Sequence, residues 1–186
     1  MSAPRNIIKP DTDAIPVIIS LGANLDSVQG DPTTTLASAT ERLHAMAAGR
    51  FVSSAFYRTA PVDCPPGTPD FINSAVIMTV AGGTLPRKLL AQLHQMEADF
   101  GRQREGVAEG KINAARCLDL DLIAFGDQRI AEPGLILPHP RAHERQFVLQ
   151  PLAELEPDLL LPGQQLTVSK LLAQLPPAAR LQCDRL

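Results

Sequence analysis

The order of strand-like and helix-like segments is the feature that most restricts how this chain can fold. Runs of apolar and β-favouring residues alternate with segments of helical periodicity, and prolines and glycines separate them. The order is strand, helix, strand, strand, helix, strand, carried by residues 17–22, 32–46, 51–59, 71–80, 85–100 and 118–125. It predicts an α+β fold, a ferredoxin-like βαββαβ sandwich in which helices pack on one face of an antiparallel sheet.

Both expected helices carry boundary signals. Asp31 supplies an N-cap for the first helix, and Pro32 occupies its first helical position. In the second helix, residues 85–100, apolar side chains recur on one stripe, and Gly101 stands where a helix C-terminus favours glycine. These signals predict two amphipathic helices with defined ends.

The segments between these elements are also informative. Residues 51–59 are rich in β-favouring side chains and predict one strand, whereas residues 60–70 contain four prolines and predict a stiff loop. Gly126 and Asp127 predict a hairpin turn into the strand that follows. Residues 168–175 predict one more helix at the surface.

The chain length of 186 residues suffices for one domain with a hydrophobic core. We expect a single catalytic domain over residues 16–175. Prolines and charges interrupt residues 1–15, which we expect to form a flexible N-terminal arm, and residues 176–186 are expected to form a C-terminal tail.

Charge and cysteine content exclude several classes of protein. The net charge of −3 argues against a broad nucleic-acid-binding surface, and the apolar runs are too short to span a membrane. The cysteines are odd in number and lack a C-x-x-C spacing: Cys64, Cys117 and Cys183. This usage predicts reduced thiols in the cytoplasm. We expect a cytoplasmic monomer that acts on small molecules.

Two carboxylates interrupt one of the strongest predicted strands of the chain. Asp119 and Asp121 alternate with leucines, so both side chains project from the face opposite Leu120. Two ionised carboxylates this close repel each other, and aspartate is depleted in strands. A solvated strand face would explain an isolated D-x-D pattern. Here we expect a bound cation, rather than another side chain, to neutralise the pair, and Mg²⁺ is the cation that prefers such oxygens.

Basic residues are concentrated around this strand. Four basic residues lie within sixteen positions before the strand: Arg102, Arg104, Lys111 and Arg116. Three more follow the strand: His139, Arg141 and Arg145. Arginine predominates, which suits two-pronged binding of phosphate oxygens. A solvated loop is the alternative for the charges alone. Beside the acids, they predict Mg²⁺-dependent polyphosphate chemistry outside the P-loop design, because no Walker A loop is present.

Several motifs, taken in order, resemble the 6-hydroxymethyl-7,8-dihydropterin pyrophosphokinase family of folate biosynthesis. They are SLGANL (20–25), SSAFYRTAPV (53–62), PDFINSAV (69–76), GRQR (101–104), RCLDLDLIAFG (116–126) and LPHPRAHERQFVLQPLAEL (137–155). The resemblance implies Mg²⁺-dependent transfer of pyrophosphate from ATP to the hydroxymethyl group of the reduced pterin, with release of AMP.

The resemblance also implies roles for individual residues. Asp119 and Asp121 match the ligands of two Mg²⁺ ions that bridge the ATP phosphates. The catalytic arginines would be Arg102, Arg104 and Arg116. The nucleotide contacts would be Glu97, Lys111, Leu122, His139 and Arg145.

For the pterin, the resemblance implies a sandwich of the ring between Phe71 and Phe147. The remaining pterin contacts would be Asn24, Thr59, Val62 and Asn73. Without the family, core packing is the simpler interpretation of both phenylalanines. For Asn73, inside a strand, packing and ligand recognition are equally reasonable.

One departure from the family pattern keeps other functions open. Where the family has tryptophan-glycine-proline before the arginine aligned with Arg116, this chain has Asn113, Ala114 and Ala115, and it contains no Trp. A paralogue that binds pterin without turnover is therefore one alternative. A non-catalytic RNA- or protein-binding ferredoxin-like module is another, although the D-x-D strand and the seven aromatic residues do not resemble an RNA-binding sheet.

Overall fold

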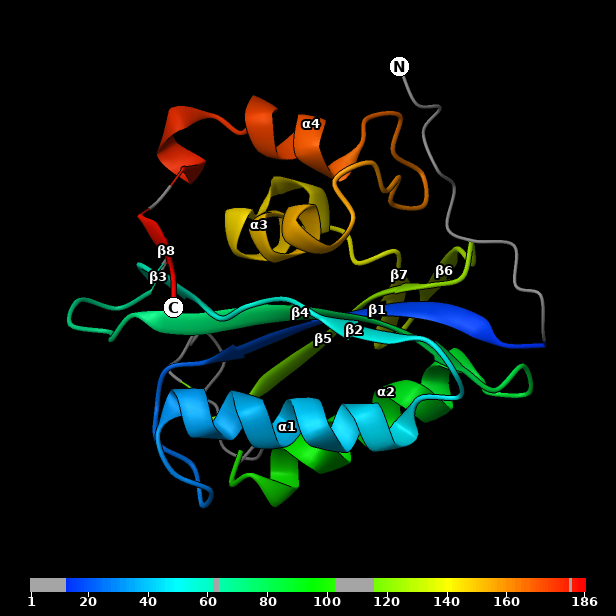
Figure 1. Ribbon diagram of the computed structural model, residues 1–186, viewed down its shortest axis with the longest axis horizontal. Coiled ribbons are helices and arrows are strands. Elements are labelled where there is room, and N and C mark those ends of the chain that lie inside the picture. The colour runs from blue at the N-terminus through cyan, green and yellow to red at the C-terminus, as the bar shows by residue number, and fades with distance from the viewer. Residues whose placement is uncertain (1–12, 62–63, 103–115, 181) are drawn as a thin grey trace.

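The computed structural model describes residues 13–61, 64–102, 116–180 and 182–186 (Figure 1). The elements are β1 (Ile15–Ala23), α1 (Pro32–Met46), β2 (Phe51–Ser53), β3 (Tyr57–Thr59), β4 (Phe71–Val80), α2 (Pro86–Asp99), β5 (Asp119–Phe125), β6 (Ile130–Glu132), β7 (Leu135–Leu137), α3 (Gln146–Leu155), α4 (Val168–Gln174) and β8 (Cys183–Arg185), with 3-10 turns at Ala142–Glu144 and Pro177–Ala179. The main sheet has the order β5-β1-β4-β3-β8, and β2 also pairs with β4. Every pairing in it is antiparallel, which confirms the predicted α+β class.

Helices cover both faces of this sheet rather than one. α1 and α2 lie on one face, and α3 and α4 lie on the other (Figure 1). The strand β1 explains why, because Ile19 and Leu21 are buried in the core beneath α1 and α2, whereas Ile18 is buried with residues of α3 and α4. A strand that is apolar on both faces needs cover on both sides. The expectation of helices on a single face is therefore wrong.

Residues 51–59 form two short strands, not the single strand that their composition predicts. Ser54 interrupts the run between β2 and β3. Its backbone N–H donates to the carbonyl of Ala75 at 3.0 Å, and its hydroxyl accepts the N–H of Ala75 at 3.1 Å. The serine side chain thus replaces part of the β ladder, and the chain bends while both strands still pair with β4.

The expected helix signals are confirmed. The carboxylate of Asp31 accepts the backbone N–H of Thr34 at 2.7 Å, and Pro32 begins α1. Gly101 follows α2 with a φ of +94°, a conformation that favours glycine. Among the described residues, no helix has both the length and the apolar character needed to cross a membrane.

The predicted hairpin after Gly126 is wrong in its partner strand. Gly126 does turn the chain, with a φ of +52°, but β6 pairs with β7 in a separate two-stranded sheet. The actual hairpin turn contains Gly134, at a φ of +76°. Because β7 leads into residues 138–145, this small sheet directs His139 back toward β5, where its N–H donates to the carbonyl of Ile123 at 2.8 Å.

Candidate active site

The alternation of β5 places its two acids over the face that α3 covers. Leu120 and Leu122 are buried in the core on the α1 and α2 side, as the sequence predicts. Asp119 and Asp121 lie on the opposite face, where both line a pocket together with His139. The bulge where β1 pairs with β5 falls after this region, between the partners of Ile18 and Ile19, so the acids keep a regular register.

The register of the sheet builds a row of site residues across three strands. Asp119 on β5 pairs with Gly22 on β1, and Gly22 pairs with Asn73 on β4. Paired residues of antiparallel strands project from the same face, and neighbouring strands are about 4.8 Å apart. The carboxylate and the amide therefore stand about 10 Å apart across the sheet, with a glycine between them that leaves the space above it open.

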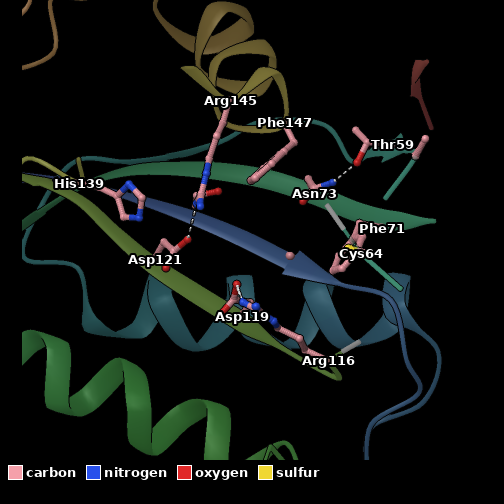
Figure 2. Close-up of a pocket in the computed structure, with 13 residues that line it drawn as sticks. Thr59, Cys64, Phe71, Asn73, Arg116, Asp119, Asp121, His139, Arg145 and Phe147 are labelled. Atoms are coloured by element: carbon pink, nitrogen blue, oxygen red, sulfur yellow. Dashed lines mark hydrogen bonds and ion pairs between the residues drawn. The ribbon is translucent and has the colours of Figure 1, made fainter. Parts of the chain in front are cut away.

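Arginines approach the acids in this structure. Arg102 and Arg116 both form ion pairs with Asp119, and a guanidinium nitrogen of Arg145 lies 3.7 Å from a carboxylate oxygen of Asp121. Figure 2 shows Arg145 reaching Asp121 from α3, on the side of the pocket opposite Arg116. The expectation that a bound cation, rather than another side chain, neutralises the pair is therefore corrected. Arginine side chains of the protein already neutralise part of the negative charge of the two aspartates.

The electrostatics still leave the acids receptive to positive charge. Burial, and then the negative charge of Asp119, raises the pKa of Asp121. Burial also lowers the pKa of the His139 imidazole, although the neighbouring Asp121 acts in the opposite direction. Each ionised group here is partly removed from water. An added cation would relieve the repulsion between the carboxylates.

Glu97 lies under the site and not in its pocket. Its carboxylate, fully buried in α2, accepts the backbone N–H of Leu120 at 2.8 Å and a guanidinium N–H of Arg102 at 2.5 Å. Burial disfavours the charge on Arg102, but Asp119 and Glu97 together raise its pKa above the ordinary value. The resemblance predicts Glu97 as a nucleotide contact; the structure shows it holding the strand and the arginine that carry the site.

The ring-binding residues of the prediction meet at the other end of the same pocket. Phe71 and Asn73 come from β4, Thr59 from β3 and Phe147 from the first turn of α3, and all four line the pocket (Figure 2). The amide nitrogen of Asn73 donates to the hydroxyl of Thr59 at 2.7 Å. Arg145, the N-cap residue of α3, also lines this pocket, so the start of α3 brings both an arginine and a phenylalanine to it.

Asn24 is a buried residue that bonds to two segments bordering the pocket. Its side chain is buried, its amide donates to the carbonyl of Pro69 at 3.2 Å, and its carbonyl oxygen accepts the N–H of Arg116 at 2.7 Å. It does not belong to the residues that line the pocket. The structure thus gives this predicted pterin contact a different position, where it ties the end of β1 to the loop before Phe71 and to an arginine of the site.

A second hollow adjoins the acids on the side of α2 and β7. It shares Arg102, Arg116, Asp119, Asp121 and His139 with the site and adds apolar and aromatic groups: Leu90, His94, Leu120, Leu122, Leu135, Ile136 and Pro140. The predicted nucleotide residues Leu122 and His139 therefore meet here. These apolar residues could hold the flat base of a nucleotide, while the charged residues shared with the site hold its phosphates.

Some lining residues are not predicted from the sequence. Leu90 and His94 are one helical turn apart on α2, next to the buried stripe, and that i, i+4 spacing could have identified them. Cys64 and Ala60 line the ring pocket from the proline-rich loop, where no periodic signal exists. Three predicted residues, Val62, Arg104 and Lys111, lie outside the described residues.

The paired acids, the arginines and the aromatic pocket define a transferase that handles phosphate groups. Comparison with known proteins gives the family. A family model described as 7,8-dihydro-6-hydroxymethylpterin-pyrophosphokinase (HPPK) matches residues 18–157. The chain belongs to this family, and it is a pyrophosphokinase of the folate pathway.

Individual relatives agree with the family model. The 2-amino-4-hydroxy-6-hydroxymethyldihydropteridine pyrophosphokinase of Methylorubrum extorquens is 37% identical over 86% of this chain and 93% of its own length. The protein of the same name from Bacillus subtilis is 39% identical over 74% of this chain and 75% of its own length.

Solved structures show the same fold at much lower identity. The wild-type Plasmodium falciparum HPPK-DHPS is 12% identical to this chain and superimposes with a TM-score of 0.62 over 88% of it. The present chain spans 41% of that longer protein. At this identity the likeness shows the fold alone, and it agrees with the antiparallel sheet and helices described above.

Proposed function

We propose that the chain transfers the terminal pyrophosphate of ATP to the hydroxymethyl group of 6-hydroxymethyl-7,8-dihydropterin, giving AMP and the pterin diphosphate. The single observation that supports this most is the row from Asp119 through Gly22 to Asn73. This row places Asp119, which would bind the metal and phosphates, and Asn73, which would bind the pterin ring, in one pocket about 10 Å apart by strand spacing. A hydroxymethyl group carried by a bound ring can then lie near the polyphosphate.

The reaction needs the substrate oxygen to displace AMP. The hydroxyl oxygen of the pterin attacks the β-phosphorus of ATP, the bond from that phosphorus to the oxygen bridging to the α-phosphate breaks, and the hydroxyl proton passes to solvent water. Arg102 and Arg116 stand beside Asp119, where they can stabilise charge that develops on the transferred and leaving phosphates. Arg145, at the N-cap of α3, would also hold the phosphates.

The donor set fits Mg²⁺. No group of three or more His, Cys, Asp or Glu side chains gathers as a complete metal cage in the described ranges. Mg²⁺ does not require one, because it is commonly held by one or two carboxylates with substrate phosphates and water. Asp119 and Asp121 would hold two such ions, which when bound would neutralise the ATP phosphates and polarise the reacting phosphorus.

The remaining residues would bind the two substrates. Phe71 and Phe147 stack on the pterin ring, and Asn73, oriented by Thr59, reads its hydrogen-bonding edge. Leu122 and His139 contact the nucleotide in the adjoining hollow. From the family resemblance we also assign Arg104 and Lys111 to the nucleotide and Val62 to the pterin.

We further propose that the chain acts as a cytoplasmic monomer with one pyrophosphokinase domain over residues 16–175. In the described part of the chain, Cys64, Cys117 and Cys183 form no disulfide with one another, which agrees with a reducing compartment.

Release of AMP tests the proposed function. We expect AMP to form from ATP only when both the reduced pterin and Mg²⁺ are present, and chelation of the metal to stop the reaction. Product chromatography with each component omitted in turn measures this. A folded protein that binds the pterin but forms no AMP would be a non-catalytic pterin-binding protein instead.

Gly22→Ala tests the row across the sheet. A Cβ atom at Gly22 would lie 3.1 Å from the amide oxygen of Asn73, closer than ordinary contact. The amide must shift, so we expect the dissociation constant of the pterin to rise about tenfold, equivalent to about 1.4 kcal/mol. Gly83→Ala is the matched control, because a Cβ there meets nothing within 4 Å. Equal pterin affinity in both variants would contradict the role of Gly22.

A further inference from the structure

The last strand of the chain lies beyond the region that the family model matches, which ends at residue 157. β8 pairs with β3 in antiparallel register, with Tyr57 opposite Arg185 and Thr59 opposite Cys183. The N–H of Leu186 donates to the carbonyl of Phe56 at 2.9 Å and extends the pairing by one residue. Figure 1 shows β8 along the outer side of β3, next to the C-terminus.

This pairing continues the row of site residues across the whole sheet. Asn73 pairs with Tyr57, and Tyr57 pairs with Arg185, so the row that starts at Asp119 ends on β8. β3 has only three residues, and the proline-rich loop follows it directly. A strand this short has few bonds of its own to hold it in place, so pairing along both of its edges fixes its position.

A side-chain cluster joins the same elements a second time. The carboxylate of Glu154 on α3 accepts the hydroxyl of Tyr57 at 2.7 Å and the N–H of Ala55 at 3.2 Å, and it pairs with Arg185 at 3.0 Å. Burial and then the Glu154 contact raise the pKa of Tyr57 to about 12, so its hydroxyl stays a donor. Arg185 therefore links the C-terminal strand to α3, the helix whose first turn carries Phe147.

Arg180, shortly before β8, is bonded to the end of α4. The guanidinium of Arg180 donates to the carbonyls of Leu175 at 2.8 Å and Ala173 at 2.5 Å, which closes the end of α4. The chain is thus held to the end of α4 at Arg180, three residues before β8 begins. β8 pairs with β3 at the edge of the sheet opposite β5, Arg185 pairs with Glu154 of α3, and no described residue of β8 lines the hollow assigned to the nucleotide.

We propose that β8 is a positioning element for the ring-binding end of the pocket, with Arg185 as its main side-chain contact. It holds β3 so that Thr59 orients the amide of Asn73, and it steadies α3 so that Phe147 lines the same pocket as Phe71. The inference rests on the proposed function, because it assigns this end of the pocket to the pterin. It predicts that the C-terminal strand controls pterin affinity separately from nucleotide affinity.

Removal of residues 183–186 tests the proposal. We expect the dissociation constant of the pterin, measured by calorimetry with a saturating non-hydrolysable ATP analogue, to rise at least about tenfold, equivalent to about 1.4 kcal/mol. The dissociation constant of the analogue itself should change less than about twofold, a difference below 0.5 kcal/mol by the same relation. KM for the pterin should rise accordingly, with KM for ATP nearly constant.

Two point variants keep the test decisive if the truncated chain unfolds. Arg185→Ala keeps the backbone pairing but loses the Glu154 contact, and we expect it to weaken pterin binding about threefold, a change of about 0.7 kcal/mol. Arg87→Ala is the matched control, because it removes another exposed ion pair, with Glu132 at 2.6 Å, outside the ring pocket. We expect it to leave pterin affinity unchanged.

The outcomes separate this inference from the proposed function. A wild-type chain that forms AMP, with a folded truncation whose pterin affinity is unchanged, overturns only the role of β8. Parallel loss of pterin and nucleotide affinity also overturns it, because that result indicates a general loss of structure. A wild-type chain that neither binds pterin nor forms AMP rejects the proposed function itself.

Discussion

Asp121→Asn is expected to lower turnover about a thousandfold, the scale of losing a charged group that stabilises the transition state. Asparagine keeps the shape of the side chain but removes the charge that would hold a cation between β5 and the ATP phosphates. The fold should persist, because burial and the charge of Asp119 already disfavour ionisation of Asp121. Initial rates at saturating pterin and ATP, across a range of Mg²⁺ concentrations, measure the effect.

A control just beyond the same strand separates this effect from damage to β5. Asp127 lies just after the strand and is exposed, so Asp127→Asn should keep the wild-type rate. Thermal unfolding of both variants should match the wild type within a few degrees. A rate near normal for Asp121→Asn, in a protein that unfolds at the wild-type temperature, would show that the metal assignment is wrong.

Glu97→Ala is expected to cost about 3–5 kcal/mol in the free energy of unfolding, as when one partner of a buried ion pair is removed. The change leaves the N–H of Leu120 and the guanidinium of Arg102 without the carboxylate that holds both. Arg102 is itself only 18% exposed, so water can replace little of what is lost. Urea unfolding followed by circular dichroism measures the difference.

The control for the Glu97 variant removes an exposed ion pair at the end of the same helix. Asp99 pairs with Arg42 at 2.7 Å, but both side chains are well exposed, so Asp99→Ala should change the unfolding free energy little. Glu97→Gln should fall between the two, because its carbonyl oxygen can still accept the N–H of Leu120. Equal stability of Glu97→Ala and Asp99→Ala would refute the supporting role of Glu97.

Local signals in the sequence predict the parts of this molecule that depend on neighbouring residues. The N-cap at Asp31, the glycine after α2 and the shared face of Asp119 and Asp121 all follow from spacing within a few positions. The family resemblance then brings Phe71 and Phe147 to the same pocket, which spacing alone does not predict, because they are far apart in the chain.

The errors fall where a contact distant in sequence decides the structure. Ser54 divides residues 51–59 into two strands because its side chain bonds to Ala75, and no local sequence pattern predicts that bond. The apolar run of α3 covers the second face of the sheet, which an element order cannot specify. Asn24 and Glu97, which the resemblance assigns to ligands, accept the backbone N–H groups of Arg116 and Leu120 in this structure, and spacing along the chain does not predict these bonds either.

The supports around β5 have a consequence for self-association. Within the described part of the chain, β5 is the last strand on its side of the main sheet, a position that commonly invites strand exchange with other molecules. Here the N–H of Leu120 is taken by Glu97 and the carbonyl of Ile123 by His139. The contacts that shape the reaction centre thus also block a template for aggregation, so variants that loosen them should lose solubility as well as rate.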